Sequence, residues 1–269
     1  EIASFKEGVV FNKVLERDVP KGATRVRLMV VLDRKFHESS HPSRPNMLRK
    51  LKMRLVCLGH LLDKQEGEVT SAPTPRLPTL RAIDQLALAM DLHCFSGDLS
   101  CCLLEGELLR DDVYVIRPEW MRQMEPGRWT DASGERYAMH LLRSVCGLRA
   151  AAADWSRTLS DHLLGEDKYP RRTQLLPLKR SHEDSCIYIL DHDKLVNDAR
   201  HAAVRSDIVG PPASKQDERD AQEAKLRSQV FWFCIWVDDS RVYTSNPTLN
   251  AVFLARYATV FTLTGGRAD

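Results

Sequence analysis

The sequence predicts an α+β fold in which antiparallel strands and amphipathic helices are mixed along the chain. Runs rich in β-branched and aromatic residues recur between turn residues, and two windows show helical spacing of apolar residues. One apolar strand leads through an acidic turn into a second strand, which is typical of a β-hairpin. The chain has 269 residues, of which 43% are hydrophobic and 28% are charged. This is ordinary for a globular protein whose buried core is large enough to fold without disulfides or structural metals.

The N-terminal third is predicted to be mainly strands. Short β-type runs cover 8–11 and 26–32, and Pro20-Lys-Gly22 between them reads as a turn. The polar stretch 36–50 contains two prolines and is predicted to be a loop, after which 51–58 returns to a strand pattern.

The first helix is predicted just after a proline-rich segment. Three prolines within 72–78 exclude a helix there, and Thr79 is a suitable N-cap. Apolar residues at helical spacing then predict a helix over 80–91. A short strand over 92–95 follows and stops at Gly97-Asp98.

The central part alternates helix, strand and a charged segment. Apolar residues on one face predict a helix over 148–164, and 186–190 has a strand pattern. The charged stretch 191–228 is interpreted as an insertion or flexible loop that is partly helical near 217–227.

The C-terminal part contains the feature that points to chemistry. The fully apolar run 230–237 predicts a buried strand, and Asp238-Asp239-Ser240 links it to a second strand over 241–244. Another helix is predicted over 249–261.

Three aspartates lie at predicted strand ends: Asp98, Asp238 and Asp239. Adjacent carboxylates repel, and a nearby cation offsets that cost. Three such acids can hold two Mg²⁺ ions, which prefer oxygen ligands and are usually shared with substrate phosphates. The alternative interpretation is that these aspartates are ordinary turn residues.

Composition limits the other classes of function. The longest apolar run has eight residues, against the roughly 20 needed to span a bilayer. Seven cysteines without a C-x-x-C pair indicate reduced, intracellular usage. The formal net charge of +2 gives no general sign of nucleic-acid binding, although the basic stretch 44–54 is compatible with a basic groove or with a solvated face. No glycine-rich phosphate loop and no Gly-x-Ser-x-Gly motif is present.

Seven segments follow one another along the chain in an order that is informative. They are Lys52-Met-Arg-Leu-Val-Cys-Leu-Gly59, Ser71-Ala-Pro-Thr-Pro75, Asp98-Leu-Ser-Cys-Cys-Leu-Leu-Glu-Gly-Glu-Leu108, Val113-Tyr-Val-Ile-Arg-Pro118, Leu142-Arg-Ser-Val-Cys-Gly-Leu-Arg149, Glu183-Asp-Ser-Cys-Ile-Tyr188 and Trp236-Val-Asp-Asp239. In this order they resemble motifs of the reverse transcriptases of copia-type (Pseudoviridae-like) retrotransposons, and the last resembles that family's Tyr-Val-Asp-Asp.

The resemblance implies roles for individual residues. Asp98 and Asp238 would be the principal ligands of two Mg²⁺ ions (with Mn²⁺ as a substitute), Asp239 would support them, and the backbone carbonyl of Leu99 would complete the set. Lys52 and Arg54 would pair with the triphosphate of an incoming dNTP. Leu103 stands where the family has the Phe that excludes a ribose 2′-hydroxyl. Without the resemblance, Lys52 and Arg54 read as a solvated strand face.

The resemblance also implies an architecture and partners. It divides the chain into fingers (1–90 with 120–147) and a palm (91–119 and 148–269) whose antiparallel sheet is backed by helices, interrupted at about 191–228. The partners would be an RNA or DNA template-primer, dNTPs and the rest of a polyprotein, with no membrane, in a cytoplasmic virus-like particle or the nucleus. The chain begins at Glu1 rather than Met and stops soon after the Asp pair, so it reads as a piece that lacks the thumb and RNase H.

The sequence departs from the family at several positions, and a second class of function follows from them. Leu103, Cys146, Ala150, Ala152 and Trp236 replace family residues. These changes suit a degenerate or domesticated piece with a structural or interaction role and no catalysis.

Overall fold

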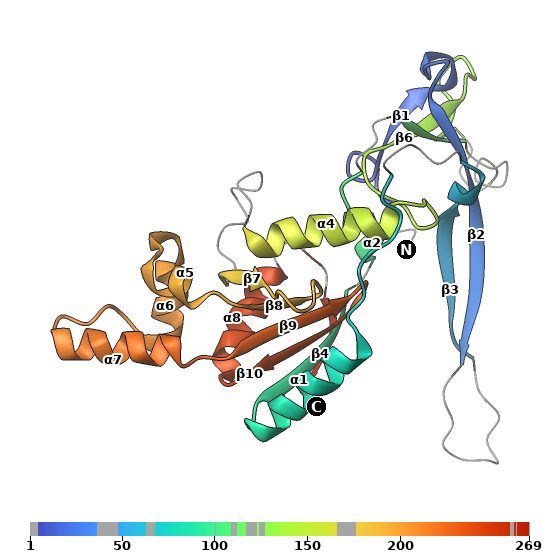
Figure 1. Cartoon of the computed structure of the whole chain (residues 1–269). Coiled ribbons are helices and arrows are strands. Elements are labelled where there is room, and N and C mark those ends of the chain that lie inside the picture. The colour runs from blue at the N-terminus through green and yellow to red at the C-terminus, as the bar shows by residue number, and fades with distance from the viewer. Residues whose placement is uncertain are drawn as a thin grey trace, which may run out of the picture. The chain divides into compact units, whose positions relative to one another are not determined.

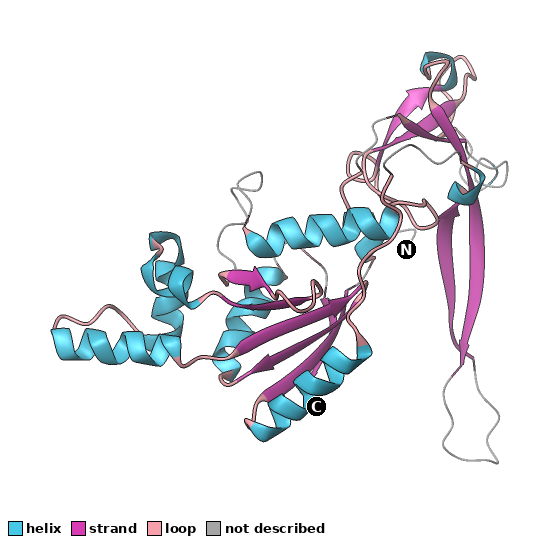
Figure 2. Ribbon diagram, in the orientation of Figure 1, coloured by secondary structure: helices cyan, strands magenta, loops and turns pink. Residues whose placement is uncertain are grey.

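The computed structural model describes residues 5–36, 48–62, 68–99, 101–108, 112–116, 123, 127–165, 176–258, 261 and 263–268. The chain forms two units, one from residues 1–71 and 103–155 and the other from 72–102 and 156–269. Each unit has its own sheet (Figures 1 and 2). The predicted α+β class is confirmed.

Unit 1 is built on a five-stranded sheet in the order β1-β6-β5-β2-β3. Its strands are β1 (Phe11–Leu15), β2 (Thr24–Phe36), β3 (Leu48–Cys57), β5 (Val113–Ile116) and β6 (Tyr137–Leu141). β2 and β5 are parallel, and the other pairs are antiparallel. Val115, Met139 and Val145 are fully buried at the centre of the core. Short 3-10 turns at Glu16–Asp18 and Gly59–Leu61 and the helix α2 (Cys102–Glu105) complete the described elements of this part.

In unit 1, the backbone around Cys57 and Gly59 packs directly against the backbone around Gly147. Gly147 has φ +91, and the Cys57 amide donates to the Cys146 carbonyl at 2.7 Å. A Cβ on Gly147 would lie 2.1 Å from the Cys57 carbonyl oxygen, and a Cβ on Gly59 would lie 2.4 Å from the Gly147 carbonyl oxygen. Only glycine allows this approach.

Unit 2 is built on a six-stranded, fully antiparallel sheet in the order β11-β4-β10-β9-β8-β7. The strands are β4 (His93–Leu99), β7 (Leu178–Arg180), β8 (Ile187–Leu190), β9 (Phe231–Trp236), β10 (Asp239–Thr244) and β11 (Leu263–Ala268). The alternation of side chains along these strands gives the sheet two apolar faces, and helices cover both.

Helix α1 (Leu77–Ala89) covers one face, where Ile83 and Ala87 pack with Cys234 and Tyr243 (Figure 1). Helix α8 (Pro247–Tyr257) covers the other face. Its Phe253 ring lies 5.1 Å from the Phe231 ring and 5.1 Å from the Phe233 ring.

Helix α4 (Ala151–Leu164) joins α8 on that second face. The Tyr188 hydroxyl donates to Ser160 at 2.9 Å, and the His162 ring meets the Phe261 ring edge-on at 5.0 Å. The antiparallel sheet with helices against it was predicted.

Four of the sequence-based expectations need correction. The helix expected at 80–91 begins at Leu77, because Pro78 in the first turn loses no hydrogen bond there, and Arg76 rather than Thr79 is the N-cap residue. The strand expected at 8–11 begins only at Phe11, since Gly8 has φ +77 and lies in a turn. The strand expected at 92–95 runs on through Asp98, where β10 and β11 flank it.

The fourth correction concerns the charged stretch 191–228, which is a small helical layer rather than a flexible loop. It contains α5 (His192–Asn197), a 3-10 turn (Ala199–His201), α6 (Ala202–Val209) and α7 (Gln216–Arg227). Leu195, Val204 and Leu226 are buried among these helices. Helix formation near 217–227 was expected, and the structure confirms it as α7.

The two compact units divide the chain at positions of their own, and the division into fingers and palm stays a prediction. Residues 72–90 belong to unit 2, because α1 packs on its sheet, and 103–119 belong to unit 1, because β5 pairs with β2 and β6. Strand residues occupy both ends of the loop expected at 36–50, since β2 ends at Phe36 and β3 begins at Leu48. Residues 37–47 lie outside the described ranges.

Candidate active site

The β9–β10 hairpin carries the acidic pair at its tip. Trp236 and Asp239 face each other across the hairpin, which leaves Val237 and Asp238 as a two-residue turn. Val237 has φ +61, a conformation that Gly usually supplies and that is strained for a β-branched residue. Both aspartates are exposed to solvent.

Strand β4 brings the third acid to the same place. Asp98 is the direct cross-strand partner of Asp239, and the Leu99 amide donates to the Asp238 carbonyl at 2.8 Å. Opposite residues in an antiparallel pair have Cβ atoms about 5 Å apart on one face of the sheet. The Asp98 and Asp239 side chains therefore leave the sheet on the same face, while Asp238 lies in the turn beside Leu99.

The carboxylate of Asp239 has a defined orientation. The Trp236 indole Nε1–H donates to Asp239 Oδ2 at 3.2 Å. The Trp236 ring in turn lies 5.7 Å from the Arg241 guanidinium, which pairs with Asp84 of α1 at 3.2 Å. The Tyr243 hydroxyl also donates to Asp84. A row of side chains along one face thus connects the acidic tip to helix α1.

This arrangement fits a divalent cation in part. Carboxylate oxygens are hard donors, and Mg²⁺ often binds through one or two carboxylates while keeping waters or substrate oxygens. The facing pair of Asp98 and Asp239 supplies that minimum, and both are open to solvent. Within the described ranges, however, no group of three or more His, Cys, Asp or Glu side chains is placed to hold a metal ion. The backbone gathers the three acids, but their side chains form no closed cage.

The remaining predicted site residues lie on other elements. Lys52 and Arg54 are two residues apart on β3 of unit 1, opposite Asp33 and Val31. The Arg54 guanidinium lies 3.7 Å from the Asp33 carboxylate, so it is part of an ion pair within its own sheet. The side chain of Lys52 lies outside the described part of the structure.

Leu103 and Leu99 flank the turn that follows β4. Leu103 is half-buried in α2 and belongs to unit 1. Leu99 is buried and pairs with Leu263 of β11, while its amide is used by Asp238.

Reasoning from the sequence missed the role of Trp236 and Arg241. The apolar run 230–237 predicts that Trp236 is buried in a strand, yet its ring nitrogen donates to Asp239, a candidate ligand. The alternation of Asp239, Arg241 and Tyr243 along a predicted strand places all three on one face, and this signal could have indicated the network.

Cys234 on β9 does not favour thiol chemistry. Burial raises the pKa of Cys234 to about 12, so this thiol is protonated at neutral pH.

No helix in the described residues is long and apolar enough to cross a bilayer. No family model matches the chain, and no curated protein or solved structure matches it either.

Proposed function

We propose that the chain is the fingers-and-palm part of a copia-type reverse transcriptase that transfers nucleotides to a primer 3′-hydroxyl. The observation that carries the proposal is the register of β4 against β10, which sets Asp98 opposite Asp239 with Asp238 in the adjoining turn. The sequence motifs predicted that these three acids share a site before any register was known. An antiparallel sheet with helices on both faces is compatible with a palm.

The proposed reaction is an in-line displacement. The primer 3′-oxygen forms a bond to the α-phosphorus of a dNTP, and the bond from that phosphorus to the pyrophosphate oxygen breaks. Divalent ions, when bound, favour deprotonation of the 3′-hydroxyl and offset the charge on the leaving pyrophosphate. The resemblance implies Asp98 and Asp238 as their principal ligands with Asp239 in support, whereas the register of β4 against β10 favours the facing pair Asp98 and Asp239, whose second carboxylate Trp236 would fix.

The resemblance also implies roles for residues of unit 1, taken by themselves. Lys52 and Arg54 would pair with the triphosphate, which for Arg54 requires exchange of its present partner Asp33. Leu103 would discriminate against a ribose 2′-hydroxyl less strongly than an aromatic ring, because its side chain is smaller and more flexible.

The test is primer extension by this chain on a poly(rA) template with an oligo(dT) primer, in Mg²⁺ and in Mn²⁺. We expect incorporation of dTTP that falls by at least about a hundredfold in Asp98→Asn and Asp239→Asn, because charge stabilisation at the reacting phosphate is lost. Asp217→Asn is the matched control, since Asp217 is an exposed acid in the first turn of α7, which leads into the start of β9, whereas the acidic pair follows the end of β9. Extension that survives both site substitutions would contradict the proposal.

A second candidate function is a structural or interaction module derived from such an enzyme. It is favoured by the open arrangement of the acids within the described residues and by the ion pair that occupies Arg54. Titration of Mn²⁺ by electron paramagnetic resonance separates the two. Binding that Asp98→Asn weakens favours the polymerase, and an Mn²⁺ affinity equal in both proteins favours the module.

A further inference from the structure

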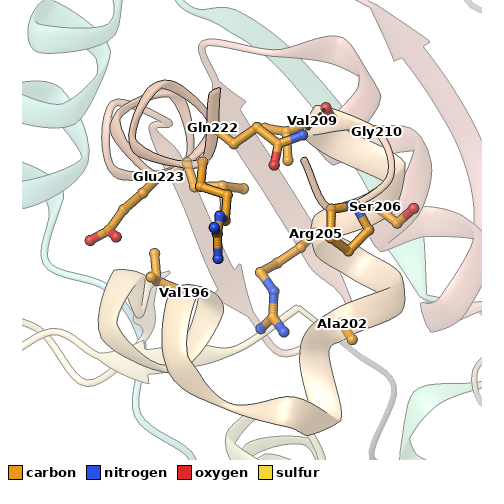
Figure 3. A pocket seen from close by; sticks show the side chains of 11 residues that line it. Val196, Ala202, Arg205, Ser206, Val209, Gly210, Gln222 and Glu223 are labelled. Atoms are coloured by element: carbon orange, nitrogen blue, oxygen red, sulfur yellow. Dashed lines mark hydrogen bonds between the residues drawn. The ribbon is translucent and has the colours of Figure 1, made fainter. Parts of the chain in front are cut away.

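The helical layer at 191–228 encloses a pocket that the proposed polymerase does not use. Its walls come from α5, α6 and α7, and its volume is about 260 Å³ (Figure 3). The layer connects the end of β8 to the start of β9, whereas the three acids lie at the far end of β9. The pocket is therefore distinct from the candidate active site.

Two arginines line the pocket from different helices, Arg205 of α6 and Arg219 of α7. Arg205 is half-buried, and its Nη1 donates to the Leu195 carbonyl at 2.9 Å and the Asp198 carbonyl at 2.7 Å. These two bonds satisfy the end of α5 and fix the guanidinium plane. Both bonds come from Nη1, so the other two guanidinium nitrogens, Nε and Nη2, have N–H groups that can donate to a ligand.

The acids nearby are already paired with other cations. Glu223, which also lines the pocket, receives a hydrogen bond from Arg227 at 2.8 Å, and Arg227 contacts Asp193 as well. Asp198 is held by Arg200 at 2.8 Å. The charged residues that line the pocket are Arg205, Arg219 and Glu223, so the lining carries one more positive than negative charge.

The rim of the pocket is shaped by the loop between α6 and α7. Gln222 Nε2 donates to the carbonyls of Val209 and Pro211, and its Oε1 accepts from the Ala213 amide. Gly210, with φ +85, ends α6 and starts the loop. The cavity is thus built before any ligand arrives, which lowers the entropy lost on binding.

Apart from Ser206, the rest of the lining is aliphatic. Val196, Val209, Pro212 and Leu226 contribute apolar surface, and Figure 3 shows Val196, Arg205 and Glu223 around one hollow. A cationic edge beside an aliphatic wall suits a ligand with one charged end and one apolar end.

We propose that this pocket binds a small organic oxyanion, a carboxylate or a phosphate monoester on an apolar body. Arg205 and Arg219 hold the oxyanion through their planar forks, and the aliphatic wall holds the body. The charged segment 191–228 is thereby a ligand-binding module of the chain.

The experiment titrates the full chain with four probes and follows binding by isothermal titration calorimetry. Phenyl phosphate and benzoate are the two anionic arms, and they distinguish a phosphate from a carboxylate preference. Benzyl alcohol lacks the charge, and inorganic phosphate lacks the apolar body. We expect at least one anionic aromatic probe to bind about tenfold or more tighter than benzyl alcohol and inorganic phosphate, as expected when charge-assisted hydrogen bonds and apolar contact are combined.

Two variants locate the binding. Arg219→Gln is expected to weaken the best probe about tenfold, because the exposed guanidinium of Arg219 makes only a long 3.3 Å bond to the Ser214 carbonyl among the described residues and can donate to the oxyanion. Arg81→Gln, an equally exposed arginine on α1, is the matched control and should leave the affinity unchanged. Ser206→Phe places a ring in the cavity from an exposed position and should abolish binding without disturbing the core.

Three results would overturn the proposal. They are the absence of binding by both anionic probes, equal binding of benzyl alcohol, and equal losses in Arg219→Gln and Arg81→Gln. Inorganic phosphate that binds as tightly as phenyl phosphate would overturn the part that assigns an apolar body. None of these outcomes depends on polymerase activity.

Discussion

The crossing of two backbone segments in unit 1 makes a quantitative prediction about Gly147. Substitution by alanine puts a Cβ 2.1 Å from the Cys57 carbonyl oxygen and 2.6 Å from Val56 Cγ1, at φ +91. The nearer contact is with backbone, so no side-chain rotation relieves it. The segments must separate, and the bond from the Cys57 amide to the Cys146 carbonyl must stretch or break.

The expected cost has two parts. The left-handed conformation costs an L-residue about 1–2 kcal/mol, of which about 0.4–1 kcal/mol is offset by the lower entropy of the unfolded alanine chain. Loss of the Cys57 bond adds about 1–3 kcal/mol, because this residue is buried and its amide is left without a partner. Gly147→Ala should therefore destabilise unit 1 by about 3 kcal/mol in total.

Gly134→Ala isolates the first part. Gly134 has φ +84, close to that of Gly147, but a Cβ there meets nothing within 4 Å. This variant should lose only about 0.5–1 kcal/mol.

The assay is urea unfolding with hydrogen exchange read on peptides of β1 and β6, which reports on unit 1 alone. With a urea slope of about 2 kcal/mol/M, Gly147→Ala should lower the midpoint by about 1.5 M and Gly134→Ala by about 0.4 M. If the two midpoints fall by the same amount, the backbone crossing is not as described and the reasoning is refuted.

Three further predictions concern the sheet of unit 2 and the buried thiols. Trp236→Phe removes the hydrogen bond to Asp239 and should weaken Mn²⁺ binding several-fold, while stability changes by no more than about 1 kcal/mol; an unchanged Mn²⁺ affinity would exclude a positioning role. Phe233→Ala should cost about 3–5 kcal/mol in thermal or urea unfolding, because this buried ring contacts the aromatic cluster of α8, and a loss under 1 kcal/mol would show that the cluster does not form. Burial raises the pKa of both Cys57 and Cys234 from 9.0 to about 12, so the unfolded chain releases these protons first as pH rises. Their contribution to stability is therefore complete below pH 9 and is lost between pH 9 and about 12, and Cys-to-Ala variants should show a smaller fall in stability over that range.

The amino-acid sequence determined the elements whose signal is local. The apolar spacing over 148–164 predicted most of α4, and the acidic turn after an aromatic run predicted the β9–β10 hairpin. Turn preferences and side-chain periodicity depend on residues that are close together in the chain, so they can be recognised without knowing the fold. The sequence also singled out Asp98, Asp238 and Asp239 as one set.

The tertiary structure decided how these residues meet. Which aspartate faces Asp98 depends on the register of β4 against β10, which is fixed by the packing of whole strands. In the same way, the ion pair of Arg54 with Asp33 depends on the pairing of β2 with β3.

The helical layer at 191–228 shows the same limit on a larger scale. Its sequence is highly charged, and apolar residues such as Leu195 and Leu226 are too sparse to display a clear period. They become a core only when α5, α6 and α7 pack together, and that packing also creates the pocket. Local composition predicted a solvated segment, because the free energy that orders it comes from contacts between residues distant in the chain.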